Sequence, residues 1–358
     1  MSNIGKSLVG KFRSLPKWWA TPFVGIAGGY VAQWCNFPLP WMIGSMLAVA
    51  LARCLTPWQI AAIPHGRSAG QFVTGLGIGM YIDDAVMAHF FNHLGLMVLG
   101  AVLTALSSLI LMALLRWAGE DRATAYFSSM PGGSTEMVNL ASRNGAQVDS
   151  VVAAQTLRLT IVVLCAPALV QSLFPMTEGV IRSLTVDWPW MAFLVPVGLL
   201  VAWLWQRLRQ PNPWLLGPIF VSAVVCVGMD VQVGFPQSIR HLAQVFIGAG
   251  LGALLSREFF LRAHGFILRT LIGTGILMAV AVGLAMVFSY MSALNLPSTM
   301  LGMMPGGIAE MSLTAEALNL SAPMVVAMQM LRVILVLFCA EPMYRLWGRL
   351  RGSGKAAG

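Results

Sequence analysis

Charge is scarce in this 358-residue chain. Asp, Glu, Lys and Arg together make up 10% of it, whereas soluble domains carry about 25%. Apolar residues make up 58%, and several uncharged runs are long enough to cross a bilayer, which takes about 20 helical residues. This composition excludes an ordinary soluble protein. It predicts an all-α, polytopic transmembrane protein that has the lipid bilayer as a partner and no appended soluble domain.

The excess of positive charge does not indicate nucleic-acid binding. The net charge is +9, but the basic residues stand singly at the ends of apolar runs, as side chains that face anionic headgroups do. The sequence has no soluble basic domain and no helix-turn-helix segment that could read DNA. We therefore expect no nucleic-acid partner.

Residues that bind metals or redox cofactors are few and dispersed. The five cysteines form no Cys-x-x-Cys pair, and the five histidines fall at the ends of predicted spans. A copper or di-iron centre needs clustered histidine and carboxylate ligands, and the sequence has no such cluster. We therefore predict no metal, no cofactor and no enzymatic activity.

A short motif that occurs twice divides the chain into two halves. Met-Pro-Gly-Gly-x-x-Glu-Met stands at residues 130–137 and again at 304–311, and Gln-x-Leu-Arg follows it at 155–158 and 329–332. Two further motifs upstream also recur in the same order, at 40–44 and 213–217 and at 71–79 and 244–252. Repeated motifs in one order and at a nearly constant spacing indicate an internal duplication.

The duplication sets the predicted domain organisation. The boundaries are a basic cytoplasmic N-terminus at 1–17, membrane repeat 1 at 18–175, a linker at 176–187, membrane repeat 2 at 188–347 and a cytoplasmic C-terminal tail at 348–358. Each repeat has about five spans and one helix broken by Pro-Gly-Gly, at 123–144 and 297–318. The predicted spans are about 18–35, 41–55, 68–82, 94–117 and 148–174, then 188–205, 214–229, 241–255, 266–290 and 323–344.

The distribution of arginines favours repeats of inverted orientation. If each broken helix enters the membrane and returns, each half has five crossings and most arginines lie on the cytoplasmic side, as the positive-inside rule requires. If the broken helices cross fully, the repeats are parallel and several arginines between 207 and 262 lie outside. We prefer the inverted arrangement. It predicts a multi-pass membrane protein with both termini in the cytoplasm.

The two Pro-Gly-Gly breaks are the predicted site. Proline lacks an N–H and glycine tolerates unusual dihedral angles, so both interrupt a helix. Freed backbone groups are tolerated inside a membrane only where they are buried in protein or line a water-filled cavity. A new half-helix starts after each break, and its N-terminus favours an anion. The break residues are Pro131, Gly132 and Gly133 in the first half and Pro305, Gly306 and Gly307 in the second.

Glu136 and Glu310 fall in the first turn of these half-helices. They either satisfy their own helix starts or bind a coupling proton, a cation or a substrate amine. Paired broken segments in corresponding positions of two halves are the best sequence pointer to a transporter's site. The neighbouring polar residues Ser134, Thr135 and Asn139 have apolar counterparts in the second half, so a shared site would be asymmetric.

Arg158 and Arg332 lie within otherwise apolar spans, each three residues after a glutamine, Gln155 or Gln329. A charge in a span usually faces the protein interior and has a partner there. Two hypotheses stay open. Each arginine either forms a salt bridge with Glu136 or Glu310, or offers its fork of donors to an anionic substrate.

A duplicated half that carries Met-Pro-Gly-Gly-x-x-Glu-Met and then Gln-x-Leu-Arg resembles the AbrB-duplication family of bacterial inner-membrane proteins. The resemblance covers about residues 20–347. It implies an integral membrane protein and little settled biochemistry, since members carry labels as different as ammonia monooxygenase and regulator of gene expression. The family pattern matches Pro131, Gly132, Gly133, Glu136, Gln155 and Arg158, and Pro305, Gly306, Gly307, Glu310, Gln329 and Arg332.

The residues favour a secondary transporter or exporter of a small polar or anionic solute, with a site near the membrane midplane at the two breaks. One alternative is a membrane sensor or scaffold that regulates gene expression indirectly. A membrane enzyme of the monooxygenase type is the third, which the absence of a ligand cluster disfavours. Small-residue spacings such as Gly75–Gly79 and Gly248–Gly252 fit helix packing within a protomer and between protomers, so a homo-oligomer stays open.

Overall fold

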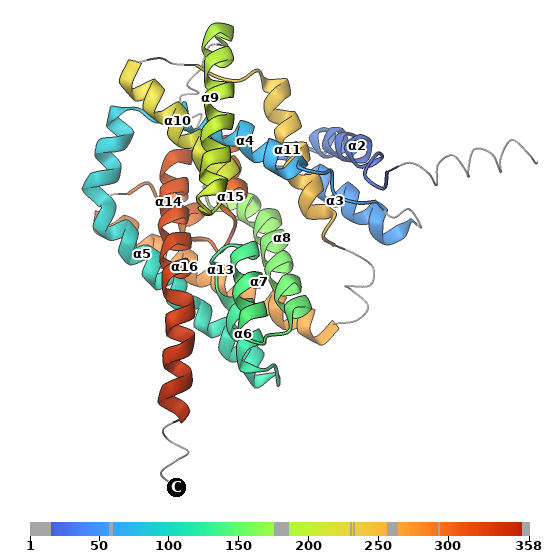
Figure 1. Ribbon diagram of the computed structural model, residues 1–358, viewed down its shortest axis with the longest axis vertical. Coiled ribbons are helices and arrows are strands. Elements are labelled where there is room, and N and C mark those ends of the chain that lie inside the picture. The colour runs from blue at the N-terminus through green and yellow to red at the C-terminus, as the bar shows by residue number, and fades with distance from the viewer. Residues whose placement is uncertain are drawn as a thin grey trace, which may run out of the picture. The chain divides into compact units, whose positions relative to one another are not determined.

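The computed structural model describes residues 16–56, 60–174, 186–229, 231, 233–255, 264–292 and 294–352 (Figure 1). These residues form helices and no strands. Most of the predicted N-terminal segment, most of the linker and the end of the C-terminal tail lie outside the described residues. The helices are α2 (Thr21–Trp34), α3 (Pro40–Leu55), α4 (Gly66–Gly79), α5 (Asp84–Trp117), α6 (Arg122–Ser129), α7 (Ser134–Arg143), α8 (Val148–Leu173), α9 (Trp188–Arg207), α10 (Pro213–Met229), α11 (Gln237–Gly252), α13 (His264–Ser292), α14 (Leu296–Met303), α15 (Ile308–Ala317) and α16 (Ala322–Gly352).

Five of these helices are long and apolar enough to cross a membrane, which confirms the prediction of a helical, membrane-type fold. They are Phe90–Trp117 of α5, Val148–Leu173 of α8, Trp188–Arg207 of α9, Gly265–Ser292 of α13 and Ala322–Leu346 of α16. Two shorter apolar helices, α3 and α10, have 16 and 17 residues, about 25 Å at 1.5 Å per residue. The other predicted spans, α2, α4 and α11, have 14 to 16 residues, and that they cross the bilayer stays a prediction.

α5 differs from its prediction at its start. We predicted a span from residue 94, but the helix begins at Asp84. Asp83 is its N-cap, and the Asp83 carboxylate accepts a hydrogen bond of 2.8 Å from the Val86 amide. The two aspartates therefore begin a helix whose apolar, membrane-length part starts only at Phe90.

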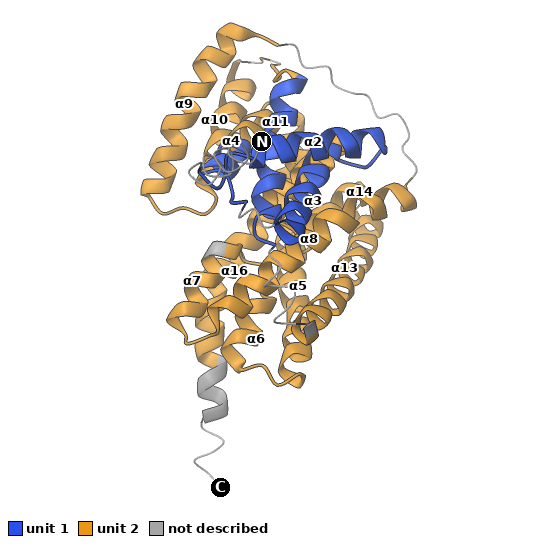
Figure 2. Ribbon diagram, turned by 90° about the vertical axis from the view of Figure 1, so that its right-hand side faces the viewer, with its two compact units in different colours: residues 1–71, 237–260 blue, residues 72–236, 261–358 orange. Residues whose placement is uncertain are grey.

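The chain forms two compact units that combine segments from both halves of the sequence (Figure 2). Unit 1 comprises residues 1–71 and 237–260, and unit 2 comprises 72–236 and 261–358. In unit 1, α11 from the second half packs against α2 and α3 from the first half. Gly248 and Gly252 of α11 lie against the carbonyl oxygens of Met42 and Met46, and a Cβ at either glycine would overlap those atoms. The Gly248–Gly252 spacing therefore serves packing within one protomer.

Unit 2 contains the reciprocal contact. Gly75 and Gly79 of α4 lie against the carbonyl oxygens of Leu215 and Ile219 on α10. These are the positions equivalent to the α11–α3 contact in the sequence repeat. α9 joins this group, because its Gly198 approaches Phe72 and Leu76 of α4. The third helix of each half thus packs on the second helix of the other half.

The rest of unit 2 holds the two Pro-Gly-Gly segments. α8 packs against α6 and α7, and α16 packs against α14 and α15 (Figure 1). The long helices α5 and α13 contact each other, and α5 also contacts α16 while α13 contacts α8. Every predicted site residue therefore lies within this one unit, between helices that come from both halves of the chain.

Candidate functional site

Each Pro-Gly-Gly segment separates two short helices. α6 ends at Ser129 and α7 begins at Ser134, while α14 ends at Met303 and α15 begins at Ile308. The residue before each proline, Met130 or Met304, is extended, as the ring of a following proline favours. The backbone then turns into the next helix at a glycine. Gly133 has φ +89°, a left-handed value that favours glycine, whereas Gly307 has an ordinary φ of −91°.

In the first half, Gln155 and Arg158 of α8 hold the end of α6. The Gln155 Nε2 donates to the carbonyl oxygens of Phe127 and Met130 at 2.9 and 3.0 Å. The Arg158 guanidinium donates to the carbonyl oxygens of Ser129 and Met130 at 3.1 and 3.3 Å, and to Gln155 Oε1 at 2.6 Å. The last carbonyls of a helix lack partners within it. The Gln–Arg pair supplies donors to them.

The second half repeats this arrangement. The Gln329 Nε2 on α16 donates to the carbonyl oxygens of Leu301 and Met304 at 2.9 and 3.0 Å. Arg332 donates to the carbonyl oxygens of Met304 and Gly306 at 2.6 and 2.9 Å, and also to Gln329 Oε1. None of these bonds of Arg158 and Arg332 goes to Glu136 or Glu310. The arginines therefore have a role that neither of our two hypotheses named, which is to hold the ends of the broken helices.

The N-terminal caps of α6 and α14, the first helices of the two broken segments, also correspond. Asp121 caps α6 by accepting from the Thr124 amide at 3.0 Å, and Asn295 caps α14 by accepting from the Ser298 amide at 3.1 Å. The Thr124 hydroxyl in turn accepts from the Gln147 amide at 2.8 Å. The Ser298 hydroxyl accepts from the amide of Ser321, the counterpart of Gln147, at 3.3 Å. These caps were not among the predicted site residues, although Asx and Ser/Thr residues immediately before a short helix are a signal for them.

The glutamates lie over the starts of their own helices. The Oε2 atoms of Glu136 and Glu310 occupy the places where side chains of Gly133 and Gly307 would begin. Glu136 also accepts a hydrogen bond from its own backbone amide. Each glutamate is the third residue of its helix, from which a carboxylate can return to the free amides of the first turn. Each carboxylate thus lies where the helix N-terminus favours negative charge.

Each of the two Pro-Gly-Gly breaks contacts a helix from the other half of the chain. At Gly132 a Cβ would overlap Val336 of α16, and at Gly307 a Cβ would lie 3.4 Å from Leu159 of α8. Tyr126 of α6 also donates to the carbonyl oxygen of Ala340 on α16 at 2.9 Å. α8 and α16 therefore bring both breaks into one region. Sequence reasoning missed Tyr126, because an isolated tyrosine carries no signal of a contact with the other half.

Positive charge is buried in this region. Arg158 and Arg332 are 2% and 1% exposed, and they lie close enough for their charges to repel each other. Within the described part of the chain, the Nε atom of each guanidinium has no hydrogen-bond partner. Glu310 is 1% exposed, whereas Glu136 is partly exposed. The region thus holds two buried cations with donor capacity to spare and two carboxylates of unequal accessibility.

Comparison with known proteins identifies the family of this chain. A sequence model of the AbrB family, described as "Transition state regulatory protein AbrB", matches residues 41–348. The chain belongs to the AbrB family. A Bacillus subtilis (strain 168) relative, "Uncharacterized protein YhjN", is 28% identical over 93% of each chain. An Escherichia coli (strain K12) relative, "Putative regulator AbrB", is 23% identical over 77% of this chain and 81% of its own.

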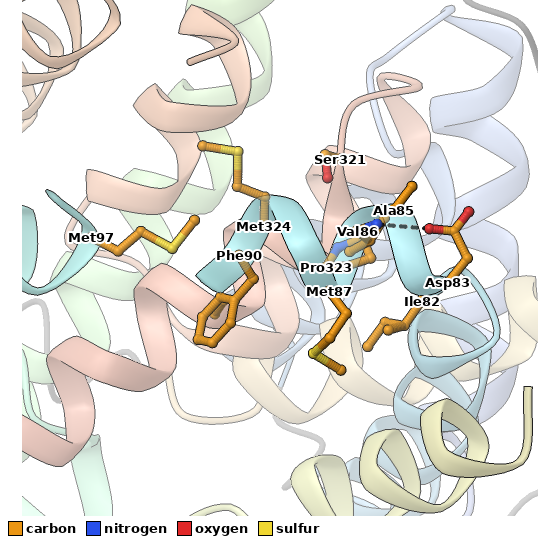
Figure 3. A pocket seen from close by; sticks show the side chains of 11 residues that line it. Ile82, Asp83, Ala85, Val86, Met87, Phe90, Met97, Ser321, Pro323 and Met324 are labelled. Atoms are coloured by element: carbon orange, nitrogen blue, oxygen red, sulfur yellow. Dashed lines mark hydrogen bonds between the residues drawn. The ribbon is translucent and has the colours of Figure 1, made fainter. Parts of the chain in front are cut away.

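This AbrB-family protein also has a cavity of about 450 Å³ between the start of α5 and the start of α16 (Figure 3). Its lining is mainly apolar and includes Phe90, Met97 and Met324, while Asp83 and Ser321 are polar. It contains none of the predicted site residues. Within the described residues, no group of three His, Cys, Asp or Glu side chains could hold a metal ion.

Proposed function

We propose that the protein is a secondary transporter of a small anionic solute, and that it is not an enzyme. The observation that carries the proposal is the pair of broken helices, α6–α7 and α14–α15, held in the same way by equivalent Gln–Arg pairs on α8 and α16. Broken helices in corresponding positions of two halves are the usual construction of a transporter's binding site. Their free backbone groups supply the polar surface that a buried solute needs.

The proposal includes two structural repeats of inverted orientation. Equivalent caps, equivalent Gln–Arg pairs and the reciprocal α4–α10 and α11–α3 contacts support a two-fold relation between the halves. The arginine distribution supports the inverted orientation. In this arrangement the α7 and α15 N-termini come from opposite sides of the membrane and meet near its midplane. Motion of one group of helices against the other gives alternating access.

The substrate is anionic because the region has spare cationic donors. Each arginine uses its terminal nitrogens to hold a broken helix, and its Nε atom remains available. Together with the N-termini of α7 and α15, these donors favour a small anion. Glu136 and Glu310 carry the coupling proton in this proposal, because carboxylates are the titratable groups at both breaks.

A flux measurement tests this function. The purified protein is first screened by thermal shift against organic acids, amino acids and inorganic anions, because a ligand that binds only the folded state raises its stability. The best solute is then loaded into proteoliposomes under an inward proton gradient. We expect gradient-driven uptake that the Glu136→Gln, Glu310→Gln double variant loses and that the Glu341→Gln control retains, because Glu341 pairs with Arg345 away from the breaks. Unchanged uptake in the double variant would contradict the proposal.

The descriptions of the family and of the Escherichia coli relative as regulators favour a second function, the regulation of gene expression. For a chain of apolar helices this regulation would be indirect, through a ligand sensed or a solute moved. A sensor predicts a ligand that stabilises the protein without any flux, or a protein that co-purifies with it. The same two assays therefore separate a sensor from a transporter.

A further inference from the structure

The carboxylates of Glu136 and Glu310 already fill the anion positions at the breaks. Each Oε2 atom lies against the glycine that begins its own helix, at Gly133 and at Gly307. α7 and α15 have ten residues each, so their N-termini carry the full positive end of a helix dipole. A solute anion drawn to either N-terminus would meet a carboxylate that is already there.

Buried arginines near the two helix starts also favour the binding of an anion. At the second break, Arg332 donates to the carbonyl oxygen of Gly306, which is the residue before the α15 N-cap. At the first break, Arg158 donates to the carbonyl oxygen of Met130. Both guanidinium groups are at least 98% buried, and each retains an Nε atom without a partner among the described residues. These spare donors are independent of the helix ends, and they too favour negative charge.

We propose that Glu136 and Glu310 are tethered competitors of the substrate, and that the substrate is a small carboxylate. The inference rests on the proposed function and adds a substrate class to it. A position that accepts the carboxylate of a glutamate has the size and the donors for the carboxylate of a solute. While the glutamate is ionised and folded back over its helix, the solute is excluded, and when the glutamate takes up a proton it loses the negative charge that held it there.

This competition couples proton uptake by the glutamate to binding of the solute. Binding of a carboxylate at α7 or α15 requires the glutamate to leave, and departure is easier for the neutral acid because its attraction to the helix dipole is gone. One proton and one carboxylate therefore enter the site together. No covalent bond changes, and the proton resides on the glutamate carboxyl group throughout.

The helices around α7 and α15 carry further charged or titratable residues. The elements that pack against α7 and α15 are α6, α8, α14 and α16, and of their charged residues Arg158 and Arg332 bond to the breaks. The remaining charged or titratable groups on these elements and on α7 and α15 themselves are Arg122, Tyr126, Arg143, Asp149, Cys165, Glu316, Cys339, Glu341, Tyr344, Arg345, Arg349 and Arg351. Of the charged groups in this region, the Oε2 atoms of Glu136 and Glu310 lie against the glycines that precede the two helices.

The carboxylate positions at the starts of α7 and α15 differ in solvent exposure. Glu136 is partly exposed, whereas Glu310 is 1% exposed. Ser134 and Asn139 near the first break are replaced by the apolar Ile308 and Leu313 near the second. We therefore expect the α7 position to exchange its carboxylate first in the conformation that the structure represents.

The test is calorimetric titration of the detergent-purified full chain with pyruvate, which stays ionised under mildly acidic conditions. Titrations run from about pH 4 to pH 8, a range that brackets the ordinary glutamate pKa of about 4.3. Phosphate serves as a second probe, because it is an inorganic anion without a carboxylate. The variants are Glu136→Gln with Glu310→Gln, which removes both charges but keeps the side-chain length, and Glu136→Asp, which keeps the charge but shortens its reach. Size-exclusion chromatography verifies that each variant is folded.

We expect pyruvate to bind the wild-type protein more tightly as the pH falls. At pH 8 the double variant should bind pyruvate about tenfold more tightly than the wild type does. This is the factor expected if the site is open in about one wild-type molecule in ten. The affinity of the double variant should not change with pH. Glu136→Asp should bind more tightly than wild type at pH 8. A double variant that binds less tightly than wild type would overturn the competition and leave the transporter proposal in place. Phosphate binding without pyruvate binding would overturn the carboxylate class, and no binding of either probe would overturn both this inference and the anionic substrate.

Discussion

At the scale of single residues, two glutamines connect the broken helices to the rest of the protein. Gln155 and Gln329 are fully buried, and each uses its amide group in two directions. The Nε2 atom donates to carbonyl oxygens at the end of a short helix, and the Oε1 atom accepts from the arginine three residues later. An amide is suited to this position because it offers donors and an acceptor within one side chain.

Replacing Gln155 by leucine should therefore destabilise the protein strongly. The change keeps the size of the side chain but removes a donor from the carbonyl oxygens of Phe127 and Met130 and an acceptor from Arg158. Buried polar groups left without a partner cost about 1–3 kcal/mol each. Thermal unfolding in detergent measures the effect. Gln171→Leu is the matched control, because Gln171 lies exposed on the same helix and its variant should unfold within about 0.5 kcal/mol of wild type. Equal melting temperatures for the two variants would contradict the prediction.

Much of this site was predictable residue by residue, but its contacts were not. The recurrence of Pro-Gly-Gly and of Gln-x-Leu-Arg selected the residues that the structure brings together. The partners of Arg158 and Arg332 were not predictable, because backbone carbonyl oxygens have no sequence signature and the glutamates were the evident acceptors. Whether either arginine also contacts a solute stays a prediction.

At the scale of helices, close contact depends on glycines that face a neighbouring backbone. Along α4, Gly75 and Gly79 meet carbonyl oxygens of α10, while a Cβ at Gly77 would meet no atom within 4 Å. The sequence showed the Gly-x-Gly-x-Gly spacing but not which glycines face a partner. The length of α5 was also underestimated, because Asp84, His89, Asn92 and His93 interrupt the apolar residues of its start.

The α4 glycines allow a matched test of this packing. Gly75→Ala should destabilise the protein by about 1–3 kcal/mol, the usual cost of overpacking a tight contact, since the new methyl group would overlap the Leu215 carbonyl oxygen. Gly77→Ala should be neutral or stabilise by up to about 1 kcal/mol, because alanine favours the helix. Chemical unfolding monitored by circular dichroism compares the two variants. A Gly77→Ala variant less stable than Gly75→Ala would show that the α4–α10 contact is not limiting.

At the scale of the whole molecule, the orientation of the two halves decides how alternating access could work. The predicted inversion puts the α2–α3 turn and the α9–α10 turn on opposite sides of the membrane. These turns have equivalent backbones, since Asn36 and Leu39 in the first and Arg209 and Asn212 in the second all have positive φ. The similar backbone of the two turns therefore does not show on which side of the membrane each turn lies. That requires an independent measurement.

Cysteine labelling distinguishes the two orientations. In a variant whose five native cysteines are replaced by serine, Asn36→Cys and Arg209→Cys are introduced one at a time. For inverted repeats, a membrane-impermeant maleimide added to intact cells with a permeabilised outer membrane should label Asn36→Cys and not Arg209→Cys. Labelling of Arg209→Cys after lysis serves as the control for reactivity. Labelling of both positions in intact cells would show parallel repeats.

The exchange of α4 and α11 between the halves could not be read from the sequence. A repeat predicts that each half resembles the other, and the simplest arrangement lets each half pack upon itself. The structure instead places Gly248 of the second half on Met42 of the first and Gly75 of the first half on Leu215 of the second. The similar motifs make both arrangements compatible with the sequence, because a helix that fits its own repeat also fits the copy.

This exchange also sets the order of events on the ribosome. Met42 is synthesised about 200 residues before Gly248, which at about 5–20 residues per second is a delay of roughly 10–40 s. During that time the face of α3 that later receives α11 stands open, with Gly44 already covered by α2 but Met42 and Met46 still without their neighbour. During synthesis α2 and α3 thus form an unfinished group, which is completed only when about two-thirds of the protein has been made.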